Sequence, residues 1–288
     1  MTSQLAPEPA SAWVRGLIRA YGASPANTLR DATNEAAWAS PLVGFARGDD
    51  PIFEQYKEVV GPFHWTPWEI FTLTYPASDA RPDELSVISW ILPQTEATKA
   101  DSRRATFYPP ERWARSRIFG EEFNAHLAMH LASALSEAGY QAVAPGRSPL
   151  WKSVPSEQYV YASLWSERHA AYACGLGTFG LCDGLITPVG KAMRAGSVVA
   201  RIALPVASRP YGDHHAYCLY YAKGTCGACM TRCPAGAITP QGHDKVRCRD
   251  HVNKTRAYVV QNYGFEGYGC GLCQTGVPCE SGIPPELR

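Results

Sequence analysis

The sequence predicts a mixed α+β domain followed by a small cysteine-rich domain. Two apolar runs, residues 85–92 and 197–204, have the length and the branched side chains of buried strands. Between them, apolar residues recur at helical spacing over residues 119–135. Eight of the ten cysteines lie between Cys218 and Cys279. Strands mixed with helices ahead of a Cys-, Gly- and Pro-rich segment are typical of an α+β domain joined to a second, smaller domain.

The elements of the first domain can be placed in chain order. A first helix is expected around Ser11–Tyr21. The strand at 85–92 should stop at Pro93, which has no N–H for a sheet ladder. The helix formed by residues 119–135 should end near Gly139, because glycine is the usual residue after a helix terminus.

The last predicted strand marks the domain boundary. Residues 197–204 end at Pro205, and the cysteine-rich segment follows. We therefore expect one domain over residues 1–205 and a second over 206–288, with residues 1–84 as an extension of unknown role.

Composition limits the classes of partner and the compartment. Lys and Arg number 27 against 26 Asp and Glu, so no summed field attracts polyanions. The N-terminus lacks a basic segment followed by an apolar one, and no stretch is long enough to span a membrane. These features predict a cytoplasmic protein without a membrane partner.

The cysteines predict metal ligation, because reducing pools keep structural disulfides open in the cytoplasm. The segment Cys226-Gly-Ala-Cys229-Met-Thr-Arg-Cys233-Pro234 matches the last three cysteines and the proline of the bacterial ferredoxin run. The first cysteine of that run would stand at position 223, which is Lys223 here, so Cys218 is the substitute.

The last cysteine of a ferredoxin run ligates the other cluster of a pair. Applying this crossed ligation to the whole segment predicts two [4Fe-4S] clusters. The first would be held by Cys218, Cys226, Cys229 and Cys279, and the second by Cys233, Cys248, Cys270 and Cys273.

Other interpretations of these residues stay open. Two C-x-x-C pairs can also form a zinc site, although zinc leaves four cysteines and the Cys-Pro step unexplained. His214 and His215 could replace a thiolate or be ordinary surface histidines. Cys174 and Cys182 fall outside the cluster count, as redox thiols or as small buried apolar residues.

A glycine motif follows a segment, Ser166–Cys174, that looks helical. Gly175, Gly177 and Gly180 match the dinucleotide-binding pattern, but that pattern requires a strand before it and a helix after it. The glycines are better explained as a tight loop that lets the backbone approach a flat or bulky ligand, or another chain segment.

Ser166–Gly177, Gly196–Val199 and the Cys-Pro-Ala-Gly-Ala-Ile segment together resemble the epoxyqueuosine reductase family, which is cobalamin-dependent and related to the reductive dehalogenases. The resemblance covers roughly residues 85 to 280. It implies a nitroreductase-like domain that holds base-off cobalamin beside a ferredoxin-like domain with two clusters. It also implies that the nearer cluster reduces the cobalt.

The resemblance also suggests site residues. Alignment through Glu167-Arg168 puts Tyr161 where the family has an acidic proton donor, and dehalogenases use a tyrosine there. A phenol is protonated at neutral pH and can donate. His169 is a candidate proton relay or a packed histidine. Arg168 and Lys191 could bind an anionic substrate or the periphery of the cofactor, and the loop at Gly175, Gly177 and Gly180 would approach the corrin ring.

The expected function is a cytoplasmic, cobalamin-dependent iron–sulfur reductase that removes oxygen, halide or another leaving group from a small organic substrate. Its electrons would come from a low-potential donor such as ferredoxin or flavodoxin. The chain lacks the helical repeats that follow the clusters in epoxyqueuosine reductases, and with its near-neutral charge this argues against a tRNA partner. The alternative is an electron-transfer or corrinoid-reactivating protein without a substrate of its own.

Overall fold

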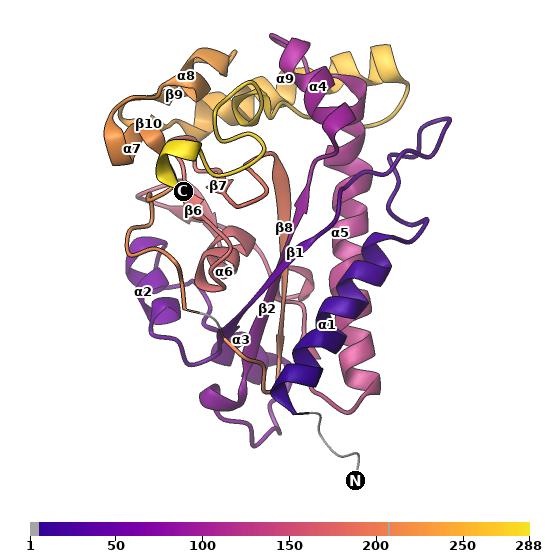
Figure 1. The fold of residues 1–288 in the computed structure, drawn as a ribbon, viewed down its shortest axis with the longest axis vertical. Helices are drawn as coiled ribbons and strands as arrows, with labels where there is room; N and C mark the ends of the chain where they lie inside the picture. The colour runs from indigo at the N-terminus through magenta and orange to yellow at the C-terminus, as the bar shows by residue number, and fades with distance from the viewer. Residues whose placement is uncertain (1–5, 207) are drawn as a thin grey trace.

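The computed structural model describes residues 6–206 and 208–288. Its centre is an antiparallel sheet in the order β1-β2-β8-β3, with helices on both faces and the cysteine-rich segment across one end (Figure 1). The mixed fold predicted from the sequence is confirmed. The sheet strands are β1 (Leu42–Arg47), β2 (Ser86–Pro93), β3 (Ala142–Val143) and β8 (Met193–Ala200).

Strand β2 explains why a period-two pattern is missing from the sequence. Every residue of β2 is buried. Ile88 and Trp90 pack into one face of the sheet, whereas Val87 and Ile91 pack into the other. Because helices cover both faces, both sets of side chains are apolar. The predicted strand at 85–92 is confirmed, while its partner β8 starts earlier and ends earlier than the predicted 197–204.

Two helices cover the first face. α1 (Pro7–Gly22) and α5 (Glu111–Glu137) bury Val14, Ile18, Phe123 and Leu127 against the sheet. Both helices were predicted. Gly139 follows the end of α5 with a φ of +90°, a conformation that glycine adopts without strain.

Shorter helices cover the second face: α2 (Ile52–Val59), α3 (Pro67–Thr74) and α6 (Glu167–Ala173). They contribute Phe53, Ile70 and Ala171 to a second apolar cluster. The predicted helix at 166–174 is thus present. In the predicted extension, residues 6–84 supply an edge strand of the sheet and helices of both layers (Figure 1).

The remaining elements are short, apart from one helix of the cysteine-rich segment. They are α4 (Glu96–Arg104), β4 (Ser153–Ser156), β5 (Val160–Ser163), β6 (Thr178–Phe179), β7 (Leu185–Ile186), α7 (Leu219–Lys223), α8 (Ala228–Arg232), β9 (Ile238–Thr239), β10 (Gly242–His243), α9 (Lys245–Tyr263) and the 3-10 turns η1 (Pro82–Glu84), η2 (Pro145–Arg147), η3 (Leu272–Gln274) and η4 (Pro285–Leu287). Among helices in the described ranges, none combines the length and apolarity needed to cross a bilayer.

The cysteine-rich segment docks on the end of α4 through polar contacts. The guanidinium of Arg232 donates to the carbonyl oxygens of Ser102 at 2.8 Å and Ala105 at 3.0 Å. Arg103 pairs with Glu280, whose side chain is only 8% exposed. Buried charge-assisted hydrogen bonds of this kind fix one segment firmly against another. The cysteine-rich segment is therefore held against α4.

Candidate metal centre and adjoining cavity

Two hollows at this end of the molecule are lined by cysteines. The smaller is lined by Cys218, Cys226, Cys229 and Cys279. The larger has a volume of about 260 Å³, and its cysteines are Cys182, Cys233, Cys248, Cys270 and Cys273. The grouping follows the division expected from crossed ligation, with Cys182 as an addition. The assignment of each thiolate to a cluster stays a prediction.

Short helices and turns position the cysteines of the smaller hollow. Cys218 is the N-cap of α7, and Cys229 lies within α8. Cys279 is far away in sequence, and its carbonyl oxygen accepts a hydrogen bond at 2.9 Å from the backbone N–H of Lys191. The smaller hollow is therefore completed by a contact between the C-terminal segment and the loop ahead of β8.

The cysteines of the larger hollow come from α8, α9 and η3. Cys233 caps the end of α8, and Cys248 lies in the first turns of α9. Between Cys270 and Cys273, Gly271 has a φ of +68°. A Cβ on Gly271 would lie 2.0 Å from the Trp113 ring, so the turn needs glycine both for its backbone and for this approach.

Cys182 lies between the two groups, a position that sequence reasoning missed. Its thiol is buried, and hydrogen bonding with Cys229 of the smaller hollow and Cys273 of the larger holds the pKa of Cys182 well below its usual range. No spacing rule links Cys182 to the ferredoxin run, because it belongs to the glycine loop. Cys174 has the apolar setting that was considered for both thiols: it is buried in the core, its sulfur lies 3.5 Å from the carbonyl oxygen of Val87, and burial raises its pKa.

Lys191 supplies a test of whether a metal–thiolate group fits here. Its side chain was expected at a substrate or cofactor periphery, yet it is only 3% exposed and lines the smaller hollow. Burial alone would lower its pKa, but the thiolates of Cys182, Cys279, Cys273 and Cys229 outweigh burial and raise it. A buried ammonium needs anionic partners, and anionic metal–thiolate groups provide them. The four thiols of the smaller hollow, with this ammonium beside them, therefore suit an anionic metal–thiolate group.

The described residues do not form a site for a single metal ion. Within residues 6–206 and 208–288, no three His, Cys, Asp or Glu side chains are grouped so that they could hold a metal ion. Thiolates that bind a four-iron cluster instead occupy separate corners of one larger group.

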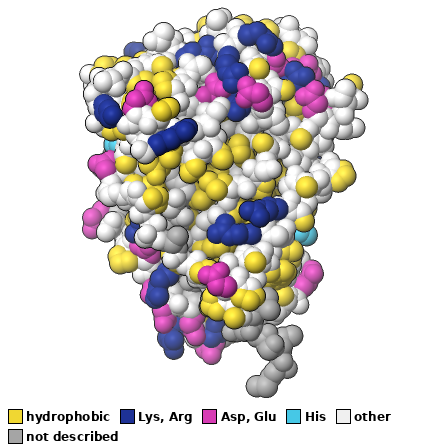
Figure 2. All heavy atoms as spheres, viewed as in Figure 1, with side chains coloured by type: hydrophobic (Ala, Val, Ile, Leu, Met, Phe, Trp, Pro, Cys, Tyr) yellow, Lys and Arg dark blue, Asp and Glu magenta, His cyan; other side chains and the backbone are white. Residues whose placement is uncertain are grey.

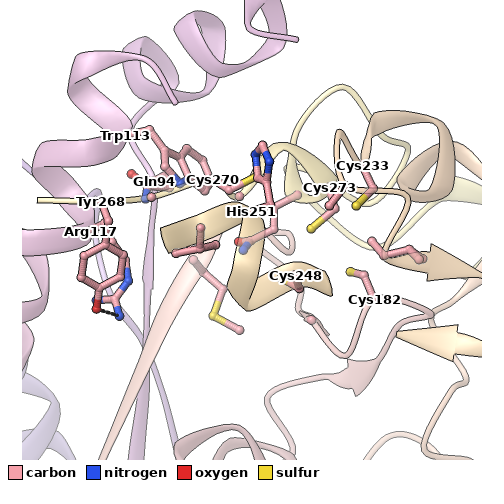
Figure 3. Close-up of a pocket in the computed structure, with 18 of the residues that line it drawn as sticks. Gln94, Trp113, Arg117, Cys182, Cys233, Cys248, His251, Tyr268, Cys270 and Cys273 are labelled. Carbon is pink, nitrogen blue, oxygen red and sulfur yellow. Dashed lines mark hydrogen bonds between the residues drawn. The ribbon is translucent and has the colours of Figure 1, made fainter. Parts of the chain in front are cut away.

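One side of the larger cavity is aromatic and polar. Trp113, Arg117 and Tyr268 lie on this side, and the guanidinium of Arg117 donates to the Tyr268 hydroxyl at 2.9 Å (Figure 3). Gln94 donates from Nε2 to Ser116 Oγ at 2.8 Å. Its buried Oε1 has no hydrogen-bond partner among the described residues. An acceptor left unpaired in such a wall is suited to an N–H of a bound molecule.

Two histidines that the sequence did not single out also line this cavity. His243 Nδ1 lies 3.0 Å from Asp183 Oδ2, and hydrogen bonds with Asp183 and then Cys248 raise the pKa of His243 to about 10. His243 is therefore the donor at neutral pH. His251 Nε2 lies 3.2 Å from the carbonyl oxygen of Phe107, which ties α9 to the segment after α4.

Of the residues expected to contact cofactor, Arg168 does line the larger cavity, where its guanidinium donates to the backbone carbonyl of Asp183. The glycine loop is different. A Cβ on Gly177 would lie 2.3 Å from the carbonyl oxygen of Ile186, so this glycine permits contact with another chain segment. Gly175 has a φ of +74°, and Gly180 lines the smaller hollow. These three glycines are not among the described lining residues of the larger cavity.

Tyr161 and His169 also lie away from the described cavity lining. Tyr161 is part of the β4–β5 hairpin, and its hydroxyl is 3.5 Å from the carbonyl oxygen of Lys245 on α9. His169 Nδ1 lies 2.8 Å from Ser166 Oγ, and burial lowers its pKa. Neither predicted catalytic side chain is therefore among the described residues that line the two hollows.

The two histidines considered as substitute ligands lie beside the cysteine-rich segment. His215 stacks on Tyr221, with ring centroids 3.9 Å apart, and its Nδ1 lies 2.8 Å from the Phe179 carbonyl oxygen. The ring of His214 packs against that of His215, with centroids 4.1 Å apart. These contacts give both rings packing partners.

Comparison with known proteins agrees with the sequence motifs. Residues of this chain are 28% identical over 132 positions to an epoxyqueuosine reductase of Leadbetterella byssophila, and 27% identical over 139 positions to one of Staphylococcus aureus. The matches cover 44% and 46% of this chain, but only 39% and 34% of the relatives' lengths. No family model matches.

A solved structure of an epoxyqueuosine reductase with an epoxyqueuosine-modified tRNA stem loop has the same fold. It aligns with 98% of this chain and 68% of its own, with a TM-score of 0.51 at 17% identity. The expected resemblance to epoxyqueuosine reductases is confirmed. The expectation of an oxidoreductase agrees with the names of both curated relatives.

One expectation about partners is wrong. The sequence was taken to argue against tRNA, but the structurally similar reductase holds a tRNA stem loop. The error lies in using net charge, because a summed charge does not report local patches. Helix α9 is basic in spite of the neutral total, with Lys245, Arg247, Arg249, Lys254 and Arg256. On the face in Figure 2, basic and acidic side chains lie intermixed near the end that carries α4 and α9.

Proposed function

We propose that this chain is an iron–sulfur reductase that uses a corrinoid to remove a leaving group from an organic substrate. The observation that carries the proposal is the pair of cysteine-lined hollows. The larger of the two is also lined by Trp113, Arg117 and Gln94. This arrangement brings an electron path and a binding space together. The similarity to proteins named epoxyqueuosine reductase supports the same class of reaction.

The two clusters would be [4Fe-4S] groups, with the four cysteines of each hollow as ligands. Electrons would enter from a low-potential external donor and pass from the smaller hollow to the larger. Cys182 lines the larger hollow and interacts with Cys229 of the smaller one, so we place it between the two clusters. In this scheme residues 206–288 act as the ferredoxin-like part, and the loop around Cys182 and Lys191 joins it to the sheet domain.

The cavity fits the polar edge of a corrinoid better than it fits a whole one. A corrinoid carries peripheral amides, which match the free acceptor of Gln94 and the guanidinium donors of Arg117, Arg168 and Arg194. A volume of about 260 Å³ lies near the lower end for small-molecule pockets, so much of the ring would extend outside the cavity. When bound, the corrinoid supplies a strongly reducing cobalt centre.

The overall reaction must balance two electrons against the bond that breaks. A substrate R–X takes up two electrons and one proton, and gives R–H and X⁻. An epoxide takes up two electrons and two protons, and gives an alkene and water. The chain's part is to supply the electrons through its clusters and a proton from a side chain. Tyr161 is the proposed donor, and His169 is the proposed relay, as the aligned family motif suggests.

The substrate can be a small molecule or a modified base within tRNA. The reductase that shares this fold was solved with a tRNA stem loop, so such a substrate belongs in any assay. A useful pair of test substrates is therefore an epoxyqueuosine-bearing stem loop and a halogenated phenol. Both substrates undergo a two-electron reduction, but in one the reacting group belongs to a tRNA stem loop and in the other to a small molecule.

The proposal is tested by anaerobic reconstitution with iron, sulfide and cobalamin. We expect about eight irons per chain in two clusters, and a corrinoid absorption spectrum that changes on reduction and persists through gel filtration. Stoichiometric zinc, or about four irons, would contradict the two-cluster scheme. Full iron content without retained corrinoid would instead favour the electron-transfer alternative, which needs no corrinoid site.

A further inference from the structure

Lys191 lines the smaller hollow, and its side chain lies against Gly184, which lines the larger one. The thiolates that raise the pKa of its ammonium belong to Cys182, Cys279, Cys273 and Cys229, which line the two hollows. Its aliphatic stem packs on Gly184, where a Cβ would lie 2.9 Å from Lys191 Cδ. One positive charge is therefore close to thiolates of both proposed clusters.

The backbone holds this lysine in place from two sides. Its N–H donates to the carbonyl oxygen of Cys279 at 2.9 Å. The preceding Gly190 has a φ of +93°, and a Cβ there would lie 2.0 Å from the Glu280 carbonyl oxygen. The turn thus rests directly on the segment that carries the last cysteine. The position of the ammonium is set by the fold and not by an exposed, mobile side chain.

Thiols, not carboxylates, surround the ammonium. Within the described ranges, no Asp or Glu forms an ion pair with Lys191, and the charges that act on it belong to cysteines. A cluster gains one negative charge when it takes up one electron. A fixed positive charge nearby stabilises the reduced form more than the oxidised form, and the effect is strong where water is excluded.

We propose that Lys191 raises the reduction potentials of both clusters and so makes them easier to reduce by the external donor. The inference rests on the proposed function, because it needs two clusters in the two hollows. It goes further in assigning one side chain to the control of both. Cys182 lies in the same region, because its Sγ and the Lys191 side chain both adjoin Gly184.

The test is a dithionite titration of the reconstituted protein, in which electron paramagnetic resonance measures the reduced fraction of each cluster. Lys191→Met removes the charge and keeps most of the volume. At a fixed potential we expect the reduced-to-oxidised ratio of both clusters to fall at least about tenfold, which is 59 mV for one electron. Lys191→Arg should restore most of the shift because it keeps the charge.

A matched control is Lys223→Met, which removes an exposed lysine of the cysteine-rich segment whose Nζ donates to the Glu286 carbonyl oxygen. It should leave both potentials near those of the unsubstituted protein, since water screens an exposed charge. If Lys191→Met holds its iron and neither potential moves, the inference fails while the proposed function stands. If the unsubstituted chain holds no clusters, the proposed function itself fails.

Lys191→Gln provides a second neutral variant, in case the methionine variant does not take up iron. A fall in both potentials in the glutamine variant supports the inference equally. If both neutral variants lose their clusters while Lys191→Arg keeps them, the charge serves cluster assembly instead, and the inference is overturned. A shift confined to one cluster would also overturn it, because the inference assigns the charge to both.

Discussion

The carboxylate of Asp183 lies 3.0 Å from Nδ1 of His243 and joins the loop between β6 and β7 to β10 of the cysteine-rich segment. Each partner has a cysteine beside it. Cys182 directly precedes Asp183 in the sequence, and the side chain of Cys248 interacts with that of His243. This ion pair therefore links the two segments beside the larger hollow. Without it, the segments that carry Cys182 and Cys248 would be held together less firmly.

Asp183→Asn should weaken this link. The variant keeps the shape of the side chain but removes the charge opposite His243. Because the Asp183 side chain is 44% exposed, we expect a loss of about 1 kcal/mol or less in the free energy of unfolding. Denaturant unfolding of the holoprotein measures it. Asp79→Asn is the control, since Asp79 is 89% exposed opposite Arg201, and an effect as large as that of Asp183→Asn would refute the linking role.

Cys226→Ala and Cys233→Ala should remove different clusters, although both residues belong to one short run. Cys226 lines the smaller hollow, and Cys233 lines the larger. Paramagnetic resonance of the reduced variants distinguishes the two signals. Cys182→Ala should keep about eight irons, because Cys182 is an additional thiol and not a proposed ligand. Loss of the same signal in the first two variants would show that the division of ligands is wrong.

Gln94→Leu should weaken corrinoid binding about tenfold, because it removes the unpaired acceptor from the cavity wall. Iron content should not change. Equilibrium dialysis with cobalamin gives the affinity. Gln55→Leu is a matched control, since Gln55 is exposed on α2. Equal affinities in the two variants would move the corrinoid away from this cavity.

Glu167 makes stability depend on pH. Burial raises the pKa of Glu167 to about 7, although Ser197 Oγ donates to its Oε2 at 2.5 Å. The folded carboxyl thus holds its proton at pH values where the unfolded one, near 4.5, has lost it. The free energy of unfolding should therefore fall as pH rises from about 4.5 to 7, by at most about 3 kcal/mol, and then level off.

Unfolding midpoints at pH 5, 6, 7 and 8 measure this dependence. The difference between the unsubstituted protein and Glu167→Gln isolates the Glu167 contribution, because glutamine has no proton to lose in this range. If the two proteins show parallel curves, Glu167 is not the group responsible.

Tyr161→Phe should lower turnover by roughly 10² to 10⁴ while cluster reduction continues, because only the acidic proton is removed. The Tyr161 hydroxyl lies 3.5 Å from the Lys245 carbonyl oxygen, and Tyr161 is not among the described residues that line the larger cavity. Tyr159→Phe is the control, as the ring of Tyr159 also lies over the Lys245 ammonium. Full turnover in Tyr161→Phe would leave the residue a packing role.

The parts of this protein that were predictable from sequence depend on short-range patterns. The apolar run of β2, the spacing along α5 and the cysteine run each predict the structure of the residues that form them. The position of Cys182 could not be predicted in this way, because its neighbours Cys229 and Cys273 are distant in the chain. Pairing of distant segments is decided by packing, which a single sequence does not display.

Gly177 illustrates the opposite error. Its place in a glycine motif suggested a close approach by a ligand, whereas the structure shows an approach by the carbonyl oxygen of Ile186. Both interpretations explain a missing side chain equally well from sequence. Gly177→Val would therefore disturb the β6–β7 turn itself, and loss of corrinoid from that variant would not locate the corrinoid.

The contact between Lys191 and Cys279 has a consequence for how the protein matures. The smaller hollow gains its fourth cysteine only when the segment around Glu280 docks on the loop ahead of β8. During synthesis, a chain that has emerged only as far as α9 would present Cys218, Cys226 and Cys229 without that fourth thiol. Iron should therefore be bound in this hollow only late in folding. Until then, the thiols of Cys218, Cys226 and Cys229 should be the ones most readily oxidised.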